Sequence, residues 1–254
     1  MKRVATALVL IPVIVWVVLW SSQWVFQGVL VLVGMLALRE FDQISAAQGL
    51  GRAGLPGMAA GLTLLFAPEP AITVVLIAVA AMTLALRVSD LKQALPYAAT
   101  FILGVVYIFG AWRCAIGLRG VDPHWLMLTL LVSWAGDTAA LYVGRSMGRH
   151  KLAPRISPGK TWEGSVGSIT AGLLAAAVYA HYLIPSARWW LVLALAAAAN
   201  VAGQAGDLCE SAFKRGAGVK DSGTTLPGHG GWLDRIDSTL FAVPVVYAVQ
   251  RYLC

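Results

Sequence analysis

The chain has 254 residues, of which 59% are hydrophobic and 12% are charged, and its formal net charge is +7. A soluble domain carries about 25% charged residues. A soluble globular fold cannot hide this much apolar surface, so lipid must solvate much of it. The composition therefore predicts an integral membrane protein.

The apolar residues are gathered into runs, most of them long enough to cross roughly 30 Å of hydrocarbon. Membrane β-barrel strands would alternate apolar and polar residues, and these runs are continuous. We therefore predict an all-α, polytopic fold with about nine transmembrane helices. The run at 54–67 is short and rich in glycine, so it is the least suited to span. The predicted spans are Val4–Trp20, Ser22–Arg39, Gly54–Ala67, Pro70–Arg87, Leu95–Leu118, Pro123–Gly144, Glu163–Ile184, Ala187–Cys209 and Ile236–Leu253.

The distribution of lysine and arginine predicts the orientation. With nine spans and the N-terminus inside, 15 of the 19 basic residues fall on one face, and only Arg113, Arg119, Arg188 and Arg251 fall on the other. This bias favours a cytoplasmic N-terminus. The tryptophans expected near the outer ends of the spans, as an interfacial belt, are Trp20, Trp24, Trp112, Trp125, Trp189 and Trp190.

The first residues, Met1-Lys2-Arg3 before an apolar run, also resemble a secretory signal, but no clear small-x-small cleavage site follows. The three cysteines form no CxxC pair, so neither zinc nor a disulfide framework is indicated. The positive charge is explained by inner-face loops and anionic lipid, and we expect no nucleic-acid partner. We predict one integral membrane domain, 1–254, with a helical scaffold at 1–122 and a catalytic half at 123–254.

The acidic residues are concentrated in the second half, where seven of the twelve occur. Asp137 lies within an apolar stretch, and Asp207 and Glu210 end the apolar run before the last loop. A charge in hydrocarbon costs about 2.5–3.5 kcal/mol on insertion scales. Such a residue is expected to face a partner, a cavity or a metal. An ion pair with an inner-face arginine is the structural alternative for Asp137.

The first polar loop runs from Arg145 through Ser157-Pro-Gly-Lys160-Thr161 to Gly164. Basic side chains beside a glycine-containing turn at a helix N-terminus suit a phosphate. The Walker spacing is absent and no strand is predicted before it. In the alternative interpretation, Thr161 caps the next helix.

The second polar loop, 207–238, mixes five carboxylates with several cations. Hard oxygen ligands suit Mg²⁺, which usually takes one or two carboxylates together with substrate phosphates. Its Pro-Gly-His-Gly-Gly run lets backbone amides approach an anion. Asp234 and Asp237 are three residues apart, so a helix that begins there would place both on one face. A basic loop lying on lipid headgroups would explain the cations but not the packed acids.

These two loops resemble the phosphatidate cytidylyltransferases, also called CDP-diacylglycerol synthases. The second loop carries the pattern Ser211-x-Phe-Lys-Arg-x4-Lys-Asp-x-Gly-x2-Leu-Pro-x-His-Gly-Gly-x2-Asp-Arg-x-Asp237. The first loop and its flanks carry a second block, from Asp137 to Gly164. The resemblance covers about 134–238. Trp232 and Leu141 depart from it, and Leu141 stands where tyrosine is common.

The resemblance implies that CTP donates a cytidylyl group to phosphatidic acid, with Mg²⁺ as cofactor. It implies catalytic roles for Lys214, Arg215, Lys220, Asp221 and Asp234. The implied metal ligands are Asp207, Asp234, Asp237 and Asp137, the last as a buried group at or beside the metal. The implied substrate-binding residues are Arg145, Lys151, Ser157, Lys160, Glu163, Ser211, His229, Gly230, Gly231 and Arg235.

Three alternatives stay open at this point. In the first, the protein is an enzyme that acts on another phosphorylated lipid, such as an isoprenoid ether lipid. In the second, it is a secondary transporter, although transporters tend to show inverted repeats and here the polar residues crowd one half. In the third, it is a non-catalytic scaffold. For the transferase we expect a bacterial inner membrane, an active site facing the cytoplasm, and possible homodimers.

Overall fold

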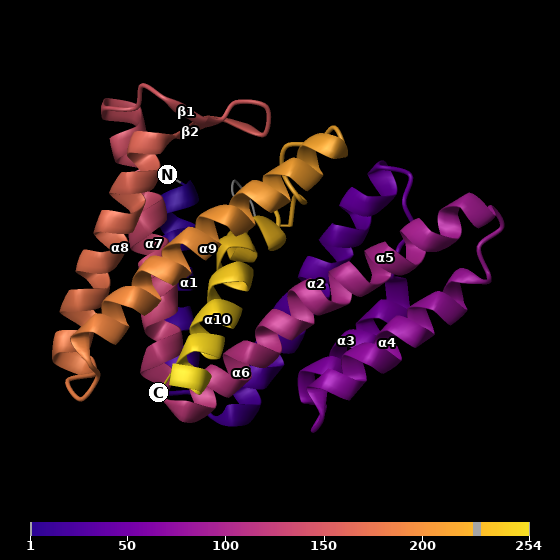
Figure 1. Ribbon diagram of the computed structural model, residues 1–254, viewed down its shortest axis with the longest axis horizontal. Coiled ribbons are helices and arrows are strands. Elements are labelled where there is room, and N and C mark those ends of the chain that lie inside the picture. Colours follow the sequence, from indigo (N-terminus) through magenta and orange to yellow (C-terminus); the bar gives the residue numbers. More distant parts are fainter. Residues whose placement is uncertain (1, 226–229, 254) are drawn as a thin grey trace. The chain divides into compact units, whose positions relative to one another are not determined.

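The computed structural model describes residues 2–225 and 230–253, and it is helical over most of this length (Figure 1). The α-helices are α1 (Lys2–Leu19), α2 (Gln23–Ala47), α3 (Gly54–Phe66), α4 (Pro70–Ala85), α5 (Ala94–Val105), α6 (Ala111–Val121), α7 (Pro123–Ser146), α8 (Trp162–Leu183), α9 (Trp189–Gly216) and α10 (Leu233–Leu253). Two short strands, β1 (Lys151–Ala153) and β2 (Ser157–Thr161), join α7 to α8.

Every apolar run predicted from the sequence lies on a helix, which confirms the all-α fold class. The fifth run is a continuous helical stretch, Leu91–Val121, in which the 3-10 turn η1 (Leu91–Gln93) precedes α5 and the π-helical segment η2 (Val106–Gly110) separates α5 from α6. The second run was predicted to end at Arg39, but α2 continues to Ala47. Glu40, Asp42 and Ser45 in this extension are buried and hydrogen-bonded within the protein.

Five helical stretches of the described chain are long and apolar enough to cross a membrane: Gln23–Ala47, Leu91–Val121, Pro123–Ser146, Trp162–Leu183 and Trp189–Gly216. Shorter apolar helices cover Val9–Leu19, Gly54–Phe66 and Pro70–Ala85. The chain is therefore a polytopic helical membrane protein, and the full set of nine spans stays a prediction.

The contacts divide the chain into two compact units, which are interleaved in sequence. Unit 1 contains Gln23–Arg113 and Phe213–Arg235, with the first few residues of the chain. Unit 2 contains Thr6–Ser22, Cys114–Ala212 and Ile236–Cys254. Each unit is described by itself below.

Unit 1 is built on α2, α3, α4 and the α5–η2 stretch. Its core holds Leu38, Leu64, Phe101 and Phe109, all at most 2% exposed. The ring of Phe109 fills the space at Gly61, where a Cβ atom would lie 2.3 Å from it. Small residues on one helix thus admit the aromatic side chains of the next, the usual solution where helices pack within a membrane.

Unit 2 is built on α7, α8 and α9, with α7 packed along α8 (Figure 1). Gly136 on α7 has no room for a side chain, because a Cβ atom would lie 2.4 Å from Asn200 Nδ2 and 2.6 Å from Ser168 Oγ. Asn200 Nδ2 donates to Ser168 Oγ over 3.1 Å, which ties α9 to α8. The glycine therefore lets α7 approach a buried polar pair that joins the other two helices.

The first polar loop contains an antiparallel hairpin, β1–β2, which was not predicted from the sequence. Lys151 pairs with Thr161, and Trp162 N donates to His150 O over 2.9 Å. Thr161 is the N-cap of α8, as in the alternative interpretation of this loop, since Gly164 N donates to its Oγ1 over 3.1 Å. Glu163 holds the hairpin's start, because it accepts His150 Nδ1 at 2.7 Å.

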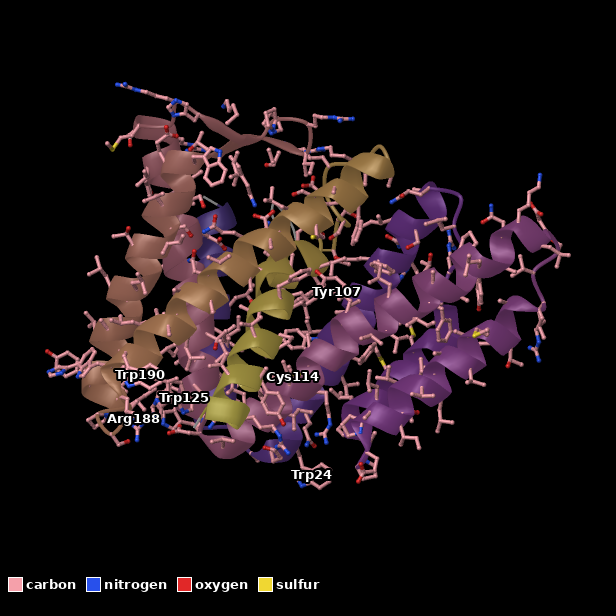
Figure 2. The ribbon with its side chains drawn as sticks, viewed as in Figure 1. Trp24, Tyr107, Cys114, Trp125, Arg188 and Trp190 are labelled. Carbon is pink, nitrogen blue, oxygen red and sulfur yellow. The ribbon has the colours of Figure 1, made fainter. Side chains whose placement is uncertain are left out.

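Four of the six tryptophans predicted to form the aromatic belt lie on the surface of the protein. Trp20, Trp24, Trp189 and Trp190 are at least 50% exposed, which a position at the lipid interface requires. Trp112 and Trp125 are 6% and 7% exposed, so they pack inside the protein and the prediction for them is wrong. In unit 2, Figure 2 places Arg188 and Trp190 at the opposite end of α8 from the hairpin.

Candidate functional site

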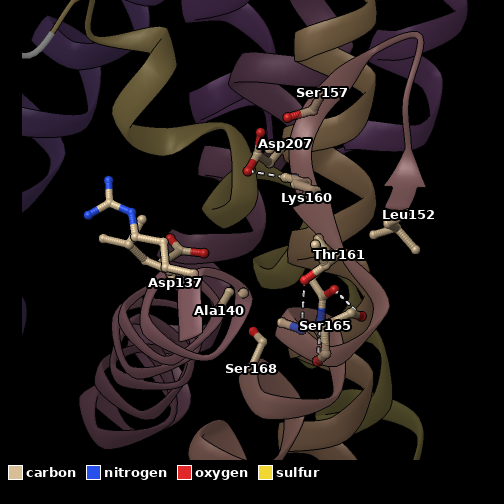
Figure 3. A pocket seen from close by; sticks show the side chains of 15 residues that line it. Asp137, Ala140, Leu152, Ser157, Lys160, Thr161, Ser165, Ser168 and Asp207 are labelled. Carbon is tan, nitrogen blue, oxygen red and sulfur yellow. Dashed lines mark hydrogen bonds and ion pairs between the residues drawn. The ribbon is translucent and has the colours of Figure 1, made fainter. Parts of the chain in front are cut away.

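Unit 2 contains a cavity of about 410 Å³ where α7, the hairpin, α8 and α9 meet (Figure 3). Five residues predicted to bind substrate or metal line it: Asp137, Arg145, Ser157, Lys160 and Asp207. They come from three separate segments of the sequence, so folding has brought the first block of the family pattern together with Asp207 on α9. Arginine and lysine beside hydroxyl groups suit phosphate oxygens.

On the wall of this cavity, Lys160 of β2 forms an ion pair with Asp207 of α9, with Nζ and Oδ2 2.7 Å apart (Figure 3). The two side chains are 25% and 34% exposed, so each remains accessible to a ligand. Ser211 Oγ donates to the other oxygen, Asp207 Oδ1, over 3.2 Å. The pair presents a cation and a carboxylate on one wall, which are the two groups that a metal-bound phosphate needs.

Asp137 was expected to be buried, and this expectation is wrong. Its side chain is exposed on the cavity wall, because α7 turns this residue toward the open space between the elements instead of toward a packed helix. Leu141, four residues on, lines the same cavity. Leu141 therefore presents an apolar side chain to the cavity, where the tyrosine common in the family would offer a hydroxyl group.

The floor of the cavity is a hydrogen-bonded polar network shared by α8 and α9. Ser165 Oγ donates to Gln204 Oε1 over 2.5 Å, and Gln204 Nε2 donates to Asn200 Oδ1 over 2.7 Å. Gln204, Ser165 and Ser168 all line the cavity. These residues were missed by the sequence analysis, although polar side chains repeated four apart on an apolar helix mark a polar stripe.

Three carboxyl groups in unit 2, those of Asp207, Glu210 and Asp237, interact with one another. Asp237 on α10 is 8% exposed, is joined to Glu210 by a side-chain hydrogen bond, and lies within electrostatic reach of Asp207. Two carboxyl groups that share a hydrogen bond need a proton between them, or a cation in its place. These hard oxygen donors fit Mg²⁺, which is usually bound through one or two carboxylates and substrate phosphates.

Unit 1 holds the central part of the second polar loop, residues 213–235, where Lys214 and Asp234 form a buried ion pair. Lys214 Nζ lies 2.5 Å from Asp234 Oδ1, and the side chains are 10% and 5% exposed. Asp234 Oδ2 accepts Ser222 N at 2.9 Å and Gly231 N at 2.8 Å. Burial alone would raise the pKa of Asp234, but Lys214 and these amides hold it below its ordinary value.

The same loop is anchored by Glu40 at the C-terminal end of α2, which the sequence analysis missed. Glu40 is 3% exposed and accepts hydrogen bonds from Ser222 Oγ, Thr225 Oγ1, Trp232 N and Leu233 N. An acidic residue in an apolar helix was the available signal. The predicted span ended at Arg39, however, so Glu40 was taken as part of a connector.

The remaining predicted residues have simpler surroundings. Arg215 Nη1 donates to Val219 O over 3.1 Å, and Lys220, Asp221 and Arg235 are exposed. Gly230 has a φ of +77°, which favours glycine. Lys151 and Glu163 belong to the hairpin and its anchor and do not line the cavity. His229 lies outside the described residues.

The predicted site residues thus form two sets. Unit 2 contains Asp137, Arg145, Lys151, Ser157, Lys160, Glu163, Asp207, Ser211 and Asp237. Unit 1 contains Lys214, Arg215, Lys220, Asp221, Gly230, Gly231, Asp234 and Arg235. Among the described residues, no three His, Cys, Asp or Glu side chains are arranged so that they hold a metal ion together.

Comparison with known proteins identifies relatives of this chain. Phosphatidate cytidylyltransferase of Staphylococcus haemolyticus (strain JCSC1435) is 42% identical over 149 residues, which cover 59% of this chain and 57% of that protein. The protein of the same name from Staphylococcus saprophyticus is also 42% identical over 149 residues, with the same coverage. The protein of that name from Staphylococcus aureus (strain COL) is 33% identical over 232 residues, 87% of each chain.

A family model supports the relationship over nearly the whole chain. The match runs over residues 1–253 and includes the N-terminal helices, which by sequence resembled only generic membrane helices. It also covers both polar loops and therefore both sets of predicted site residues. This chain belongs to the cytidylyltransferase family.

Proposed function

We propose that this protein transfers the cytidylyl group of CTP to phosphatidic acid, giving CDP-diacylglycerol and pyrophosphate. The contact between Lys160 and Asp207 carries the proposal, because at a polar cavity it joins the first block of the family pattern to Asp207, where the second polar loop begins. The names of the three relatives agree with this reaction. A cavity lined by Arg145 and Lys160 at the ends of membrane helices suits a lipid headgroup better than a translocated solute.

The reaction needs little covalent help from the protein. An oxygen of the lipid phosphate attacks the α-phosphorus of CTP, a new P–O bond forms, and the bond to the β-phosphate breaks to release pyrophosphate. The attacking oxygen is already anionic near neutral pH, so no general base is required. The protein must hold two anions in line and neutralise their charge.

The cations of the two loops supply part of that neutralisation. Arg145 and Lys160 line the cavity in unit 2, where they would bind phosphate oxygens. Lys214, Arg215 and Lys220 would bind the triphosphate or the lipid phosphate from the second loop. Arginine offers a fork of donors and lysine a point charge, and both bind phosphate strongly when water is scarce.

Mg²⁺ is the proposed cofactor. Asp207 and Asp237, which interact electrostatically in unit 2, would hold it, with Asp234 and Asp137 as further candidates. When bound, the ion would polarise phosphate oxygens and offset the charge that develops on pyrophosphate. Ser211, which donates to Asp207, would orient that carboxylate.

The proposed setting is a bacterial inner membrane, with nine spans and the N-terminus in the cytoplasm. The lysine and arginine bias supports this orientation. It puts both polar loops on the side where CTP is found. In unit 2 the hairpin and the exposed Trp189 and Trp190 lie at opposite ends of α8, as this orientation requires.

A direct assay tests the function. Purified full-length protein in detergent, supplied with Mg²⁺, CTP and phosphatidic acid, should release pyrophosphate and form a CDP-lipid in equal amounts. Competition with an isoprenoid ether lipid phosphate distinguishes the nearest alternative, since the preferred acceptor will suppress transfer to the other. Pyrophosphate release without a lipid product would refute the proposed transfer.

A further inference from the structure

The loop that carries Lys214 and Asp234 depends on a carboxylate from a distant part of the chain. We propose that Glu40, on α2, is a positioning residue for this loop in cytidylyl transfer. The inference rests on the function proposed above, but the placement of the loop by Glu40 can be tested without any assay of activity.

The two oxygens of Glu40 are both fully used. Oε2 accepts Ser222 Oγ at 3.0 Å and Leu233 N at 2.9 Å. Oε1 accepts Trp232 N at 3.1 Å and also the hydroxyl of Thr225. A buried charge is costly unless it is paired or hydrogen-bonded, and four donors meet that need here. The loop is therefore folded around this one carboxylate.

Two of these donors are the backbone amides at the beginning of α10. The first amides of a helix have no partner within the helix, and a negative charge beside them is favourable. A side chain of the neighbouring sequence usually fills this role. Here Glu40 fills it from a position 193 residues away from Leu233. Glu40 thereby sets where α10 begins, and Asp234 is the next residue.

Ser222 links Glu40 to the ion pair. Its hydroxyl donates to Glu40 Oε2, while Asp234 N donates to the same hydroxyl over 3.3 Å. Its backbone amide donates to Asp234 Oδ2 over 2.9 Å. Asp234 in turn holds Lys214 Nζ at 2.5 Å. An unbroken chain of hydrogen bonds therefore runs from Glu40 to both charged groups.

The glycines of the loop fit tightly around Glu40. A Cβ atom on Gly231 would lie 2.3 Å from Glu40 Oε2 and 2.2 Å from Ser222 Oγ. A Cβ atom on Gly223 would lie 2.8 Å from Glu40 Oε1. The backbone of the loop thus approaches the Glu40 carboxylate so closely that only glycine fits at these two positions.

Substitution by glutamine gives the sharpest test, because the side chain keeps its shape. The amide group replaces one acceptor oxygen with a donor, which then faces two donors of the loop. Asp42 offers a matched control on the same helix. It is a buried carboxylate that accepts Ala53 N and Gly54 N, both at 2.8 Å, at the beginning of α3 and not in the loop.

The first experiment measures amide hydrogen exchange in the full-length protein by mass spectrometry. E40Q should speed exchange at Ser222 and at 231–234 by roughly tenfold or more, the scale of one lost hydrogen bond to a charged group. D42N should leave these amides unchanged and speed exchange near Gly54. Unchanged exchange of the loop in folded E40Q would overturn the proposal, whatever the enzyme's activity.

The second experiment measures kcat and KM for CTP in variants that remain folded by thermal unfolding. E40Q should lower kcat by roughly 100-fold, the scale of a misplaced catalytic group. S222A should lower it less, and E40Q/S222A should be no worse than E40Q alone, because both act through one contact. The effects of D42N and S222A on kcat should add in the double variant D42N/S222A.

If E40Q does not fold, T225V removes one hydrogen bond to Glu40 and serves instead, with S222A as its partner in the cycle. The proposal would be overturned if the effects of E40Q and S222A on kcat were additive in the double variant. It would also be overturned if E40Q and D42N had the same kcat at equal stability, because Glu40 would then have a merely structural role. If wild-type protein transfers no cytidylyl group, the proposed function fails, while the exchange result still decides whether Glu40 places the loop.

Discussion

Lys160 Nζ lies 2.7 Å from Asp207 Oδ2, and this contact joins the hairpin to α9 within unit 2. Each side chain alone is expected in a polar loop or at a helix end. Together they place a cation and a carboxylate on the wall of one cavity, next to the cluster of Asp207, Glu210 and Asp237. Substitutions of residues that line the cavity should therefore lower the catalytic rate while the protein remains folded.

Removing the charge of Lys160 should reduce catalysis. K160M is expected to lower kcat/KM by about 100-fold or more, the usual scale when one group that stabilises transition-state charge is lost. R155M is the matched control, because Arg155 is an exposed cation of the same hairpin and does not line the cavity. Steady-state kinetics with CTP and phosphatidic acid measure both. Equal losses in the two variants would argue against a specific role for Lys160.

Asp207 and Asp234 should be indispensable for turnover. D207N and D234N each keep the size of the side chain and remove its charge, so the proposed binding of Mg²⁺ or of Lys214 is lost. We expect activity below detection in each, with elution as a single folded species from size-exclusion chromatography. Near-normal turnover in a folded variant would show that the metal or catalytic role given to that residue is wrong.

Chelation should abolish activity reversibly. EDTA is expected to stop cytidylyl transfer, and added Mg²⁺ should restore it. A ligand that binds only the folded state raises the unfolding temperature. Mg²⁺ should therefore stabilise wild-type protein against heat, and D207N/D237N should show no such shift. Full activity in EDTA would contradict the proposed cofactor.

The ion pair of Lys214 and Asp234 should add a pH dependence to stability. Because the pKa of Asp234 is lowered in the folded protein, its contribution is complete above the unfolded pKa, near 3.8, and is lost as the pH falls through the lower folded value. The free energy of unfolding should therefore drop below about pH 4. The free energy of unfolding of K214M should fall less over this range, because Asp234 then lacks the lysine charge that lowers its pKa. Thermal unfolding from pH 3 to pH 7 measures the difference.

Gly136 should not tolerate a side chain. G136A places a methyl group 2.4 Å from Asn200 Nδ2, and overpacking of this kind costs roughly 1–3 kcal/mol. G28A is the control, because the corresponding Cβ on α2 meets nothing within 4 Å. Alanine also stabilises a helix relative to glycine, so G28A should unfold at or above the wild-type temperature. A G136A protein as stable as wild type would mean that the three helices can separate at this point.

The helices were predictable because their signal is local. Each apolar run is long and continuous, and hydrogen bonding within the segment is the only way to satisfy its backbone in lipid. The cap at Thr161 was predictable for the same reason, since its partner is three residues away. The last span was predicted to begin at Ile236, and α10 begins three residues earlier, at Leu233.

Contacts between distant segments were not accessible in this way. The hairpin of 151–161 was not predicted, because its residues have no strong alternation of apolar and polar side chains. Trp112 and Trp125 were assigned to the lipid interface, although tertiary packing buries them. Asp137 was expected to be buried, but a cavity opens beside it. In each case the outcome depends on which helix lies next to the residue.

The pattern of residue types along the chain was sufficient for the membrane class, the helices and the polar motif, since all three arise from neighbours in sequence. Folding alone decided that Glu40 and Leu233, 193 positions apart, share a hydrogen bond, and that Lys160 meets Asp207. Hydrophobicity and helix propensity act over a few residues. A buried carboxylate finds its donors only when the backbone of another segment is brought within about 3 Å.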